Sequence, residues 1–295
     1  MNLSISQYVK RIDQVSCLIP TSNGIDSLSV LGNFDTISIS PEDMADMGGK
    51  FKGMISSDWN ECLAPCGPFD PIAFLYPELQ ADLSGIFRSY TGNQISLGEA
   101  TRRLGKLLPR PLSEKDMDTY LEASFVTYRG VVELIRWCIT HDILFMINTT
   151  GMQGYFQRAM ARNLLPQGIT VAANPMISYP GHDKDMYAVR EIEDKGKNTE
   201  TVMRRYGLPP NKVILMGDSG GDGPHFAWGA SVGAYLVGSM PKASLEKYCR
   251  GKGVQIHARF GVTYAEGEKK DPQREMTVDF MELVPKIREV IGLPP

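Results

Sequence analysis

The chain has 295 residues, of which 42% are apolar and 22% charged, close to the average of globular proteins. This composition excludes a disordered, collagen-like or coiled-coil chain, and the length suffices for one α/β core plus a second module. The 31 basic and 34 acidic residues are well mixed and leave a net charge of −3, so no broad positive surface is expected. We therefore expect no nucleic-acid partner.

The N-terminal sequence and the cysteines predict a cytoplasmic protein that does not associate with membranes. Residues 1–6 contain neither a basic nor an apolar signal region, and no stretch reaches the ~18–20 uninterrupted apolar residues of a membrane span. The five cysteines are odd in number and scattered, unlike a secreted disulfide framework. We expect them to be reduced thiols.

The sequence predicts clear secondary structure only after the first fifty residues. Residues 4–19 could form a short amphipathic helix and residues 27–31 a strand, but no role follows for segment 1–50. Residues 51–57 read as a strand that ends on the polar cluster Asp58-Trp59-Asn60-Glu61. Open α/β sheets bind their ligands at the carboxyl ends of strands, which makes this cluster a candidate site.

A helical module is predicted next. Residues 71–123 carry apolar residues at helical spacing, with breaks at residues 91–93 and 109–111. Ser113, followed by acidic residues, is a typical helix N-cap. We therefore expect a small bundle of helices in this part of the chain.

Two further strands end on polar residues. Residues 143–147 form an unbroken apolar run, typical of a buried parallel strand, and lead into Asn148-Thr149-Thr150-Gly151. Residues 212–216 lead into a loop that runs from Gly217 to Asp222. Another strand is expected over residues 233–237, and helices over 130–140, 153–163, 199–206 and 281–291. Three strands thus deliver polar residues to one edge of a parallel sheet.

The acidic residues at these strand ends predict a metal site. Buried carboxylates are costly unless a cation or strong donors compensate them, so a cluster of Asp58, Asp218 and Asp222 implies a bound metal. A ligand set of oxygen atoms alone favours Mg²⁺. Such an ion would hold a phosphate oxygen near Asp58 and offset negative charge during an in-line displacement.

The order and spacing of these motifs resemble the haloacid-dehalogenase-like (HAD-like) superfamily, in particular its phosphoserine-phosphatase-like branch. Residues 57–65 resemble the first motif of that family, and Thr149 matches the Ser/Thr of the second. Lys195, twelve residues before Gly207, matches the lysine of the third motif, and the acids of the loop 217–222 match the fourth. The resemblance covers residues 51 to about 237.

The resemblance implies a fold and a domain organisation. The fold is a three-layer α/β sandwich with a parallel, Rossmann-like sheet and an inserted α-helical cap of the C1 type. The core would comprise residues 51–65 and 129–295, and the cap residues 66–128, closing over Asp58. Caps of this kind exclude water and select the substrate.

The resemblance also implies the chemistry. Asp58 would attack the phosphorus of a small phosphorylated metabolite and form an aspartyl-phosphate. Thr149 and Lys195 would hold the phosphoryl oxygens, within a substrate-binding loop that includes Thr150 and Gly151. Two choices stay open from the sequence, Thr149 against its neighbour Thr150, and Lys195 against Lys197.

The same resemblance assigns the metal ligands. Mg²⁺ would be bound by a carboxylate oxygen of Asp58, the backbone carbonyl of Asn60 and Asp218. Asp222 would bind the ion directly or through a water molecule. The expected activity is that of a phosphoric monoester hydrolase or phosphotransferase. Dehalogenation by the same nucleophile ranks last, because the paired acids of residues 217–222 indicate a cation.

Asn60 departs from the family pattern. At this position the family's phosphatases carry a second Asp that protonates the leaving group and then activates water, and an amide can do neither. Losing a general acid/base costs ~10²–10⁴ in rate. Three explanations stay open: an engineered trap, an enzyme that recruits its proton donor elsewhere, and a protein that only binds phospho-ligands. Glu61 is the nearest carboxyl, on the other side of the turn.

The remaining polar residues receive ordinary interpretations. His182, His225 and His257 are expected in loops or at the surface. Three arginines of the helical module are expected on solvated helix faces, although a substrate carboxylate or second phosphate could also bind there: Arg88, Arg102 and Arg103. The identity of the substrate and the oligomeric state do not follow from the sequence.

Overall fold

The structure, a computed structural model, describes residues 51–91, 94–181, 186–268 and 271–294. The segment 1–50, with the helix and strand expected in it, lies outside the described residues, as do Cys17 and His182. The chain divides into two units, Met1–Ser40 and Pro41–Pro295. All described residues belong to the second unit.

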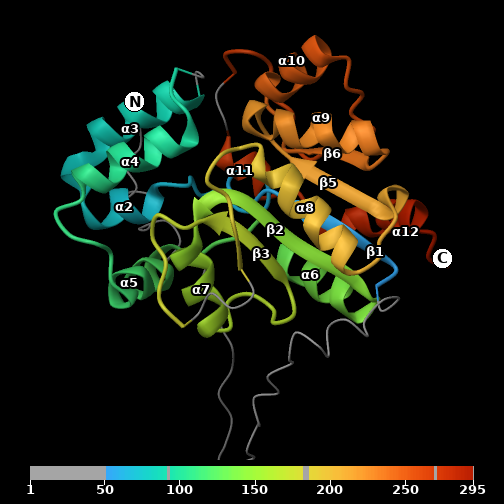
Figure 1. Ribbon diagram of the computed structural model, residues 1–295, viewed down its shortest axis with the longest axis horizontal. Helices are drawn as coiled ribbons and strands as arrows, with labels where there is room; N and C mark the ends of the chain where they lie inside the picture. Colours follow the sequence, from blue (N-terminus) through green and yellow to red (C-terminus); the bar gives the residue numbers. More distant parts are fainter. Residues whose placement is uncertain (1–50, 92–93, 182–185, 269–270, 295) are drawn as a thin grey trace, which may run out of the picture. The chain divides into compact units, whose positions relative to one another are not determined.

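Seven strands form one sheet in the order β4-β3-β2-β1-β5-β6-β7, and every neighbouring pair is parallel (Figure 1). In chain order the strands are β1 (Gly53–Ser57), β2 (Ile143–Met152), β3 (Thr170–Asn174), β4 (Met186–Ala188), β5 (Val213–Gly217), β6 (Tyr235–Ser239) and β7 (Ala258–Phe260). The chain moves outward from β1 through β2, β3 and β4, and then returns to the other side of β1 with β5. This reversal is a topological switch point, where open α/β sheets form a crevice at the carboxyl ends of the strands.

Helices cover both faces of the sheet. The side chains of Met54 and Ile55 point to opposite faces, as alternation along a strand requires, and belong to two separate hydrophobic clusters. Three helices pack on the Ile55 face: α6 (Val131–Thr140), α7 (Gln153–Ala161) and α12 (Val284–Ile291). The Met54 face is covered by α8 (Asp194–Arg205), α9 (Gly223–Val232) and α10 (Ala243–Lys252). The predicted three-layer α/β architecture is confirmed.

Helices also fill the segment between β1 and α6, where the sequence predicts them. We call residues 66–128 the helical insertion; its helices are α2 (Asp70–Leu75), α3 (Gln80–Thr91), α4 (Leu97–Leu107) and α5 (Glu114–Ser124) (Figure 1). Ser113 caps α5, and the Asp116 side chain accepts a hydrogen bond from the Ser113 backbone in return. The insertion contacts the core through a bidentate ion pair between Arg158 of α7 and Asp118 of α5. Nε and Nη2 of Arg158 each donate to one carboxylate oxygen of Asp118, both at 2.8 Å.

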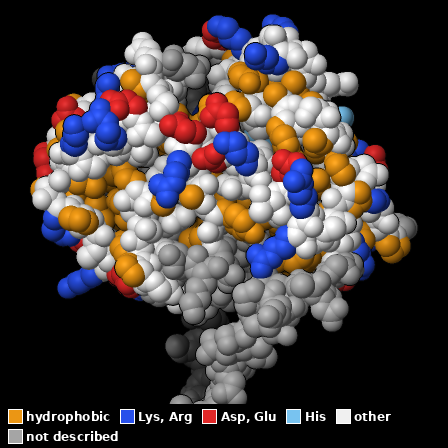
Figure 2. Space-filling model, in the orientation of Figure 1, with side chains coloured by type: hydrophobic (Ala, Val, Ile, Leu, Met, Phe, Trp, Pro, Cys, Tyr) orange, Lys and Arg blue, Asp and Glu red, His pale blue; other side chains and the backbone are white. Residues whose placement is uncertain are grey.

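Short elements complete the fold: the 3₁₀ turns η2 (Pro77–Leu79), η3 (Pro210–Lys212), η4 (Gly220–Asp222) and η5 (Phe280–Leu283), and the helix α11 (Pro272–Glu275). None of the helices in the described residues is long and apolar enough to cross a membrane. Basic and acidic side chains alternate over the face shown in Figure 2, as the mixed sequence predicts.

Candidate active site

Three acidic side chains meet at the switch point. Asp58 follows β1, and Asp218 and Asp222 follow β5, the neighbour of β1 in the sheet. One carboxylate oxygen from each of the three lies within 4.8 Å of the others. Gly217 makes this possible, because a Cβ atom there would lie 2.6 Å from the Cγ atom of Asp222. All three residues are at least nine-tenths buried.

A tight turn fixes the position of Asp58. The Asp58 N–H donates to the carbonyl of Met216 on β5 at 2.9 Å, which continues the pairing of the two strands. The carbonyl of Trp59 then accepts hydrogen bonds from the N–H groups of Cys62, Leu63 and Ala64. The chain therefore reverses directly after Asp58, so the carboxylate stands at the strand end rather than in a helix.

The end of β2 brings Thr149 beside this turn. The Thr149 hydroxyl donates to Asn60 Oδ1 at 3.1 Å and accepts from the Gly151 N–H at 3.1 Å. A Cβ atom on Gly151 would lie 2.8 Å from Asn60 Oδ1, so glycine is required for this approach. Thr149 is fully buried and Thr150 only half-buried. Thr149 is thus the residue next to the first motif, and Thr150 instead faces Tyr90 of α3.

Lys195 enters the cluster from the first turn of α8. Its ammonium nitrogen lies 2.6 Å from Asp222 Oδ1 and 3.1 Å from Asp58 Oδ1, and its side chain is only 2% exposed. The alternative, Lys197, pairs with Asp194 on the surface. Asn148 holds the start of α8 in place by donating to the carbonyl of Lys195 at 2.9 Å.

A second lysine belongs to the site and was missed by the sequence interpretation. Lys242 follows β6, and its ammonium nitrogen lies 2.6 Å from both Asp218 Oδ2 and Glu61 Oε2. Glu61 itself has a left-handed backbone, with φ of 59°, which turns its side chain to this side of the loop. The position of Lys242 just past a predicted strand was the available signal, because all polar strand ends of a parallel sheet lie at one edge.

The electrostatics of this cluster favour a divalent cation. Its four carboxylates and two ammonium groups leave a formal charge of −2. Burial raises the pKa of Asp58, although Lys195 opposes the shift, and burial raises the pKa of Asp218 to about 7. Burial would also raise the pKa of Asp222, but the Lys195 ammonium and backbone N–H groups hold it below its ordinary value. Excess buried negative charge of this kind is stabilised by a cation.

The donor set fits Mg²⁺. Asp58 Oδ1 and Asp218 Oδ2 are buried and have no hydrogen-bond partner among the described residues, so their lone pairs are engaged only through the lysine ion pairs. Together with Asp222 they offer oxygen ligands alone, the type that Mg²⁺ prefers.

The Asn60 amide is held on both sides. Its oxygen accepts from Thr149, and its nitrogen donates to the backbone carbonyl of Cys66 at 3.2 Å. This pattern fixes the orientation of the amide, with the nitrogen turned away from Thr149. The side chain can orient a neighbouring group but cannot exchange a proton with it.

Tyr90 is a residue of the helical insertion that reaches the cluster and has no signal in the sequence. Its hydroxyl would lie 3.9 Å from a Cβ on Gly221, in the loop after β5, and it interacts with Thr150 near the end of β2. Both β2 and β5 are neighbours of β1 in the sheet, so the hydroxyl lies over the end of β1. Burial raises the pKa of Tyr90 to about 12, which keeps it a neutral donor.

Arg102 and Arg103 pair with Glu99 on the exposed face of α4, away from the carboxylate cluster. The surface position expected for His225 is wrong: it is 1% exposed, lies in α9 and shares a hydrogen bond with Thr199 at 2.9 Å. Trp59, like the other aromatic residues near the turn, packs in the core.

No family model and no curated protein matches the sequence, but its fold matches solved structures. A phospho-aspartyl intermediate analogue of phosphoserine phosphatase superimposes with a TM-score of 0.56 at 14% identity, covering 80% of this chain and 99% of that one. A HAD family hydrolase from Salmonella enterica subsp. enterica serovar Typhi gives 0.53 at 14% identity, covering 76% and 77%. Cytosolic 5'-nucleotidase IIIB bound to cytidine gives 0.53 at 13% identity, covering 85% and 88%. The chain therefore has the HAD-like fold.

Proposed function

We propose that this chain of HAD-like fold is a Mg²⁺-dependent phosphatase or phosphotransferase that acts on a small phosphate ester through an aspartyl-phosphate on Asp58. The observation that carries the proposal is the meeting of Asp58 with a buried lysine and two further carboxylates at the switch point of the sheet. A carboxylate beside a cation and a metal-type donor set is suited to bind and attack a phosphoryl group. The similarity to a phospho-aspartyl analogue structure supports the same chemistry.

In the first step, an oxygen of Asp58 attacks phosphorus, and the bond between phosphorus and the ester oxygen breaks. Lys195 and Thr149 hold the phosphoryl oxygens, one as a point charge and the other as a hydroxyl donor. Thr150 and Gly151, the next residues of β2, would lie beside this group. Asp58, the carbonyl of Asn60, Asp218 and Asp222 would hold Mg²⁺, which would supply charge neutralisation for the displacement.

In the second step, water attacks the phosphorus of the aspartyl-phosphate and releases phosphate and Asp58, or an acceptor alcohol takes the group instead. The helical insertion acts as the cap: Tyr90 of α3 lies over the end of β1, where its hydroxyl is available to donate to a phosphoryl oxygen and restricts the access of bulk water. Asn60 contributes orientation but no proton, so the proton for a poor leaving group comes from water or from the cap.

A second function is favoured by one observation. The Asn60 amide is fixed between Thr149 and the Cys66 carbonyl, in the position where a general acid is needed. A protein with this arrangement retains phosphate and metal binding and loses turnover. The alternative is therefore a phospho-ligand binding protein.

The test is hydrolysis of p-nitrophenyl phosphate with Mg²⁺ and with excess EDTA. We expect steady-state turnover that requires the metal and is abolished by Asp58→Asn, while far-UV circular dichroism stays unchanged. Glu246→Ala, which removes a carboxylate paired with Arg259 at the surface, is the control for loss of a negative charge. Binding of inorganic phosphate without turnover selects the binding protein, and full activity in Asp58→Asn removes the nucleophile assignment.

A further inference from the structure

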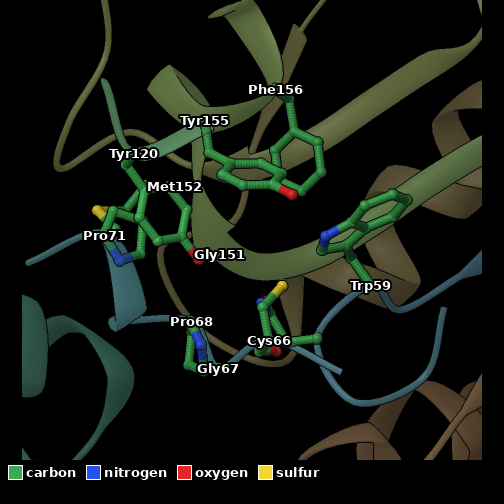
Figure 3. Close-up of a pocket in the computed structure, with 11 residues that line it drawn as sticks. Trp59, Cys66, Gly67, Pro68, Pro71, Tyr120, Gly151, Met152, Tyr155 and Phe156 are labelled. Atoms are coloured by element: carbon green, nitrogen blue, oxygen red, sulfur yellow. The ribbon is translucent and has the colours of Figure 1, made fainter. Parts of the chain in front are cut away.

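The residues on either side of Asp58 lie in two different environments. Trp59, which follows it, packs against the aromatic rings of Tyr155 and Phe156 (Figure 3). Ser56, two residues before Asp58 on β1, is fully buried on the face of the sheet that α8 covers. Central strands of parallel sheets are ordinarily apolar on both faces, so a buried serine at this position requires a reason.

Ser56 belongs to a buried hydrogen-bonding network centred on Thr199 of α8. The Thr199 hydroxyl lies 2.9 Å from the Ser56 hydroxyl and accepts from Asn148 Nδ2 at 3.0 Å. It donates to the backbone carbonyl of Lys195 at 2.9 Å, and His225 Nε2 lies 2.9 Å from the same hydroxyl oxygen. The four side chains of this network are at most 1% exposed. One hydroxyl therefore joins β1, β2, α8 and α9.

Each member of the network is close in the chain to a residue of the candidate active site, at a separation of one to four positions. The four pairs of network residue and site residue are Ser56 and Asp58, Asn148 and Thr149, Thr199 and Lys195, and His225 and Asp222. A displacement of the Thr199 hydroxyl would therefore reach all four of these site residues through the backbone.

The network is not arranged for maximal stability. Asn148 Oδ1 and His225 Nδ1 are buried and have no hydrogen-bond partner among the described residues. Such atoms cost stability, and a partly satisfied polar network is less stable than an apolar core. Polar groups that break the local packing rule at such a cost are typical of functional sites.

The hydrogen bonds also determine the tautomer of His225. The Thr199 hydroxyl has one proton, which it donates to the Lys195 carbonyl, so it acts as an acceptor toward His225. Nε2 therefore carries the ring proton, and Nδ1 is bare. Burial lowers the pKa of His225 to about 3, so the ring stays neutral.

We propose that Thr199, together with the three side chains bonded to it, positions Lys195 relative to Asp58 for phosphoryl transfer. The inference rests on the proposed function, because it assigns the network to the reaction at Asp58. The network holds the lysine at its backbone carbonyl, and two carboxylates hold it at its ammonium group, so both ends of the residue are fixed. The network side chains are positioning residues, since none of them is among those proposed to contact the phosphoryl group.

The test compares the binding of two probes in the presence of Mg²⁺, inorganic phosphate and orthovanadate. Phosphate is tetrahedral, whereas orthovanadate adopts the trigonal-bipyramidal geometry of phosphorus at the transition state. Dissociation constants for the full chain are measured by titration calorimetry. A positioning network should matter more for orthovanadate, because a transition-state mimic requires every contacting group to be in place at once.

Thr199→Val keeps the shape of the side chain and removes the hydroxyl. We expect it to weaken orthovanadate relative to phosphate by about 10- to 100-fold, as a misplacement of up to about 1 Å would. Thr199→Ser, which restores the hydroxyl, should retain most of the wild-type ratio. Thr201→Val is the matched control, because Thr201 donates in the same way to the Lys197 carbonyl, at 2.8 Å, on the exposed face of α8. An unchanged ratio in Thr199→Val, or an equal loss in Thr199→Ser, overturns the inference.

His225→Leu gives a second test that does not depend on the folding of Thr199→Val. It removes the donor to Thr199 and the unpaired Nδ1 together, so the urea midpoint should stay close to that of the wild type. The preference for orthovanadate should nevertheless fall, and His225→Gln, which keeps an N–H donor, should preserve it. Loss of stability with an unchanged preference in His225→Leu would show a purely structural role and overturn the inference.

Nuclear magnetic resonance of the wild-type chain tests the hydrogen-bond directions themselves. The ¹⁵N shifts of the His225 ring should identify the Nε2–H tautomer at neutral pH. The opposite tautomer would mean that Thr199 donates to His225 instead of to the Lys195 carbonyl, which contradicts the proposed positioning.

The outcomes also separate this inference from the proposed function. Turnover of p-nitrophenyl phosphate by the wild type, together with an unchanged ratio in Thr199→Val, leaves the phosphatase in place and removes the positioning role. Absence of turnover and of phosphate binding in the wild type removes the proposed function, and the inference with it.

Discussion

The ammonium nitrogen of Lys195 lies 2.6 Å from Asp222 Oδ1, and the two side chains are only 2% and 1% exposed. The same nitrogen contacts Asp58 at 3.1 Å. One cation therefore joins the start of α8 to the loops after β1 and β5. Because both carboxylates are buried, they depend on this lysine for compensation whenever no metal is bound.

Lys195→Met should destabilise the metal-free protein by about 3–5 kcal/mol, the cost of removing one partner of a buried ion pair. Mg²⁺ should restore part of that loss, because it compensates the same carboxylates. Urea unfolding in EDTA and in excess Mg²⁺ measures both effects. Lys197→Met is the matched control: its ion pair with Asp194 is exposed, so the expected loss is below about 1 kcal/mol. Equal losses in the two variants would show that Lys195 is not the compensating cation.

Asp218→Ala should weaken Mg²⁺ binding by more than the ~10–100-fold that loss of an outer-shell partner costs, because we propose Asp218 as a direct ligand. Titration calorimetry on the phosphate-free chain gives the dissociation constant of Mg²⁺. Glu246→Ala should bind Mg²⁺ like the wild type, since its carboxylate pairs with Arg259 outside the cluster. An unchanged affinity in Asp218→Ala would place the metal elsewhere.

The buried His225 should make the protein less stable in mild acid. Burial lowers its pKa to about 3, whereas in the unfolded chain it is ~6.5. As pH falls below 6.5, the unfolded state takes up a proton that the native state excludes, so stability decreases. Between pH 8 and pH 5 the free energy of unfolding should fall by about 2 kcal/mol through this group. Urea unfolding at several pH values should show a shallower dependence in His225→Gln, and an identical dependence in both proteins would contradict the assignment.

The central sheet could be predicted because its strands have unmistakable sequences. Residues 143–147 and 213–216 are apolar on both faces, as central parallel strands are, and each ends on polar residues. The strands β3, β4 and β7 escaped prediction. β4 and β7 are three residues long, at the two edges of the sheet, and β3 reads Thr-Val-Ala-Ala-Asn, whose small residues give no strand pattern.

The carboxylate cluster could also be predicted, since the carboxyl ends of adjacent parallel strands must meet. The contacts that the helical insertion makes with this cluster could not be predicted from the sequence. Tyr90 reaches the cluster only because α3 lies over the strand ends, and no periodicity in residues 80–91 indicates that orientation.

The position of Asn60 combines two tasks: the backbone carbonyl is available to a metal whatever the side chain, whereas proton transfer requires a titratable side chain. Asn60 Nδ2 donates to the Cys66 carbonyl, so an aspartate in its place would face that carbonyl oxygen. The protonated acid keeps the hydrogen bond and the anion does not, which favours the protonated form that a general acid needs.

Asn60→Asp should therefore raise the turnover of alkyl phosphates by ~10²–10⁴-fold, the usual contribution of a general acid/base. Turnover of p-nitrophenyl phosphate should rise less, because its leaving group needs little protonation. Affinity for Mg²⁺ and inorganic phosphate should stay within about threefold, since the carbonyl of residue 60 and the contacts of Lys195 are retained. Steady-state rates with both esters, alongside calorimetric titrations, measure these effects. If the unaltered chain already hydrolyses alkyl phosphates rapidly and the substitution changes nothing, another residue donates the proton, and Tyr90→Phe becomes the variant that should abolish it.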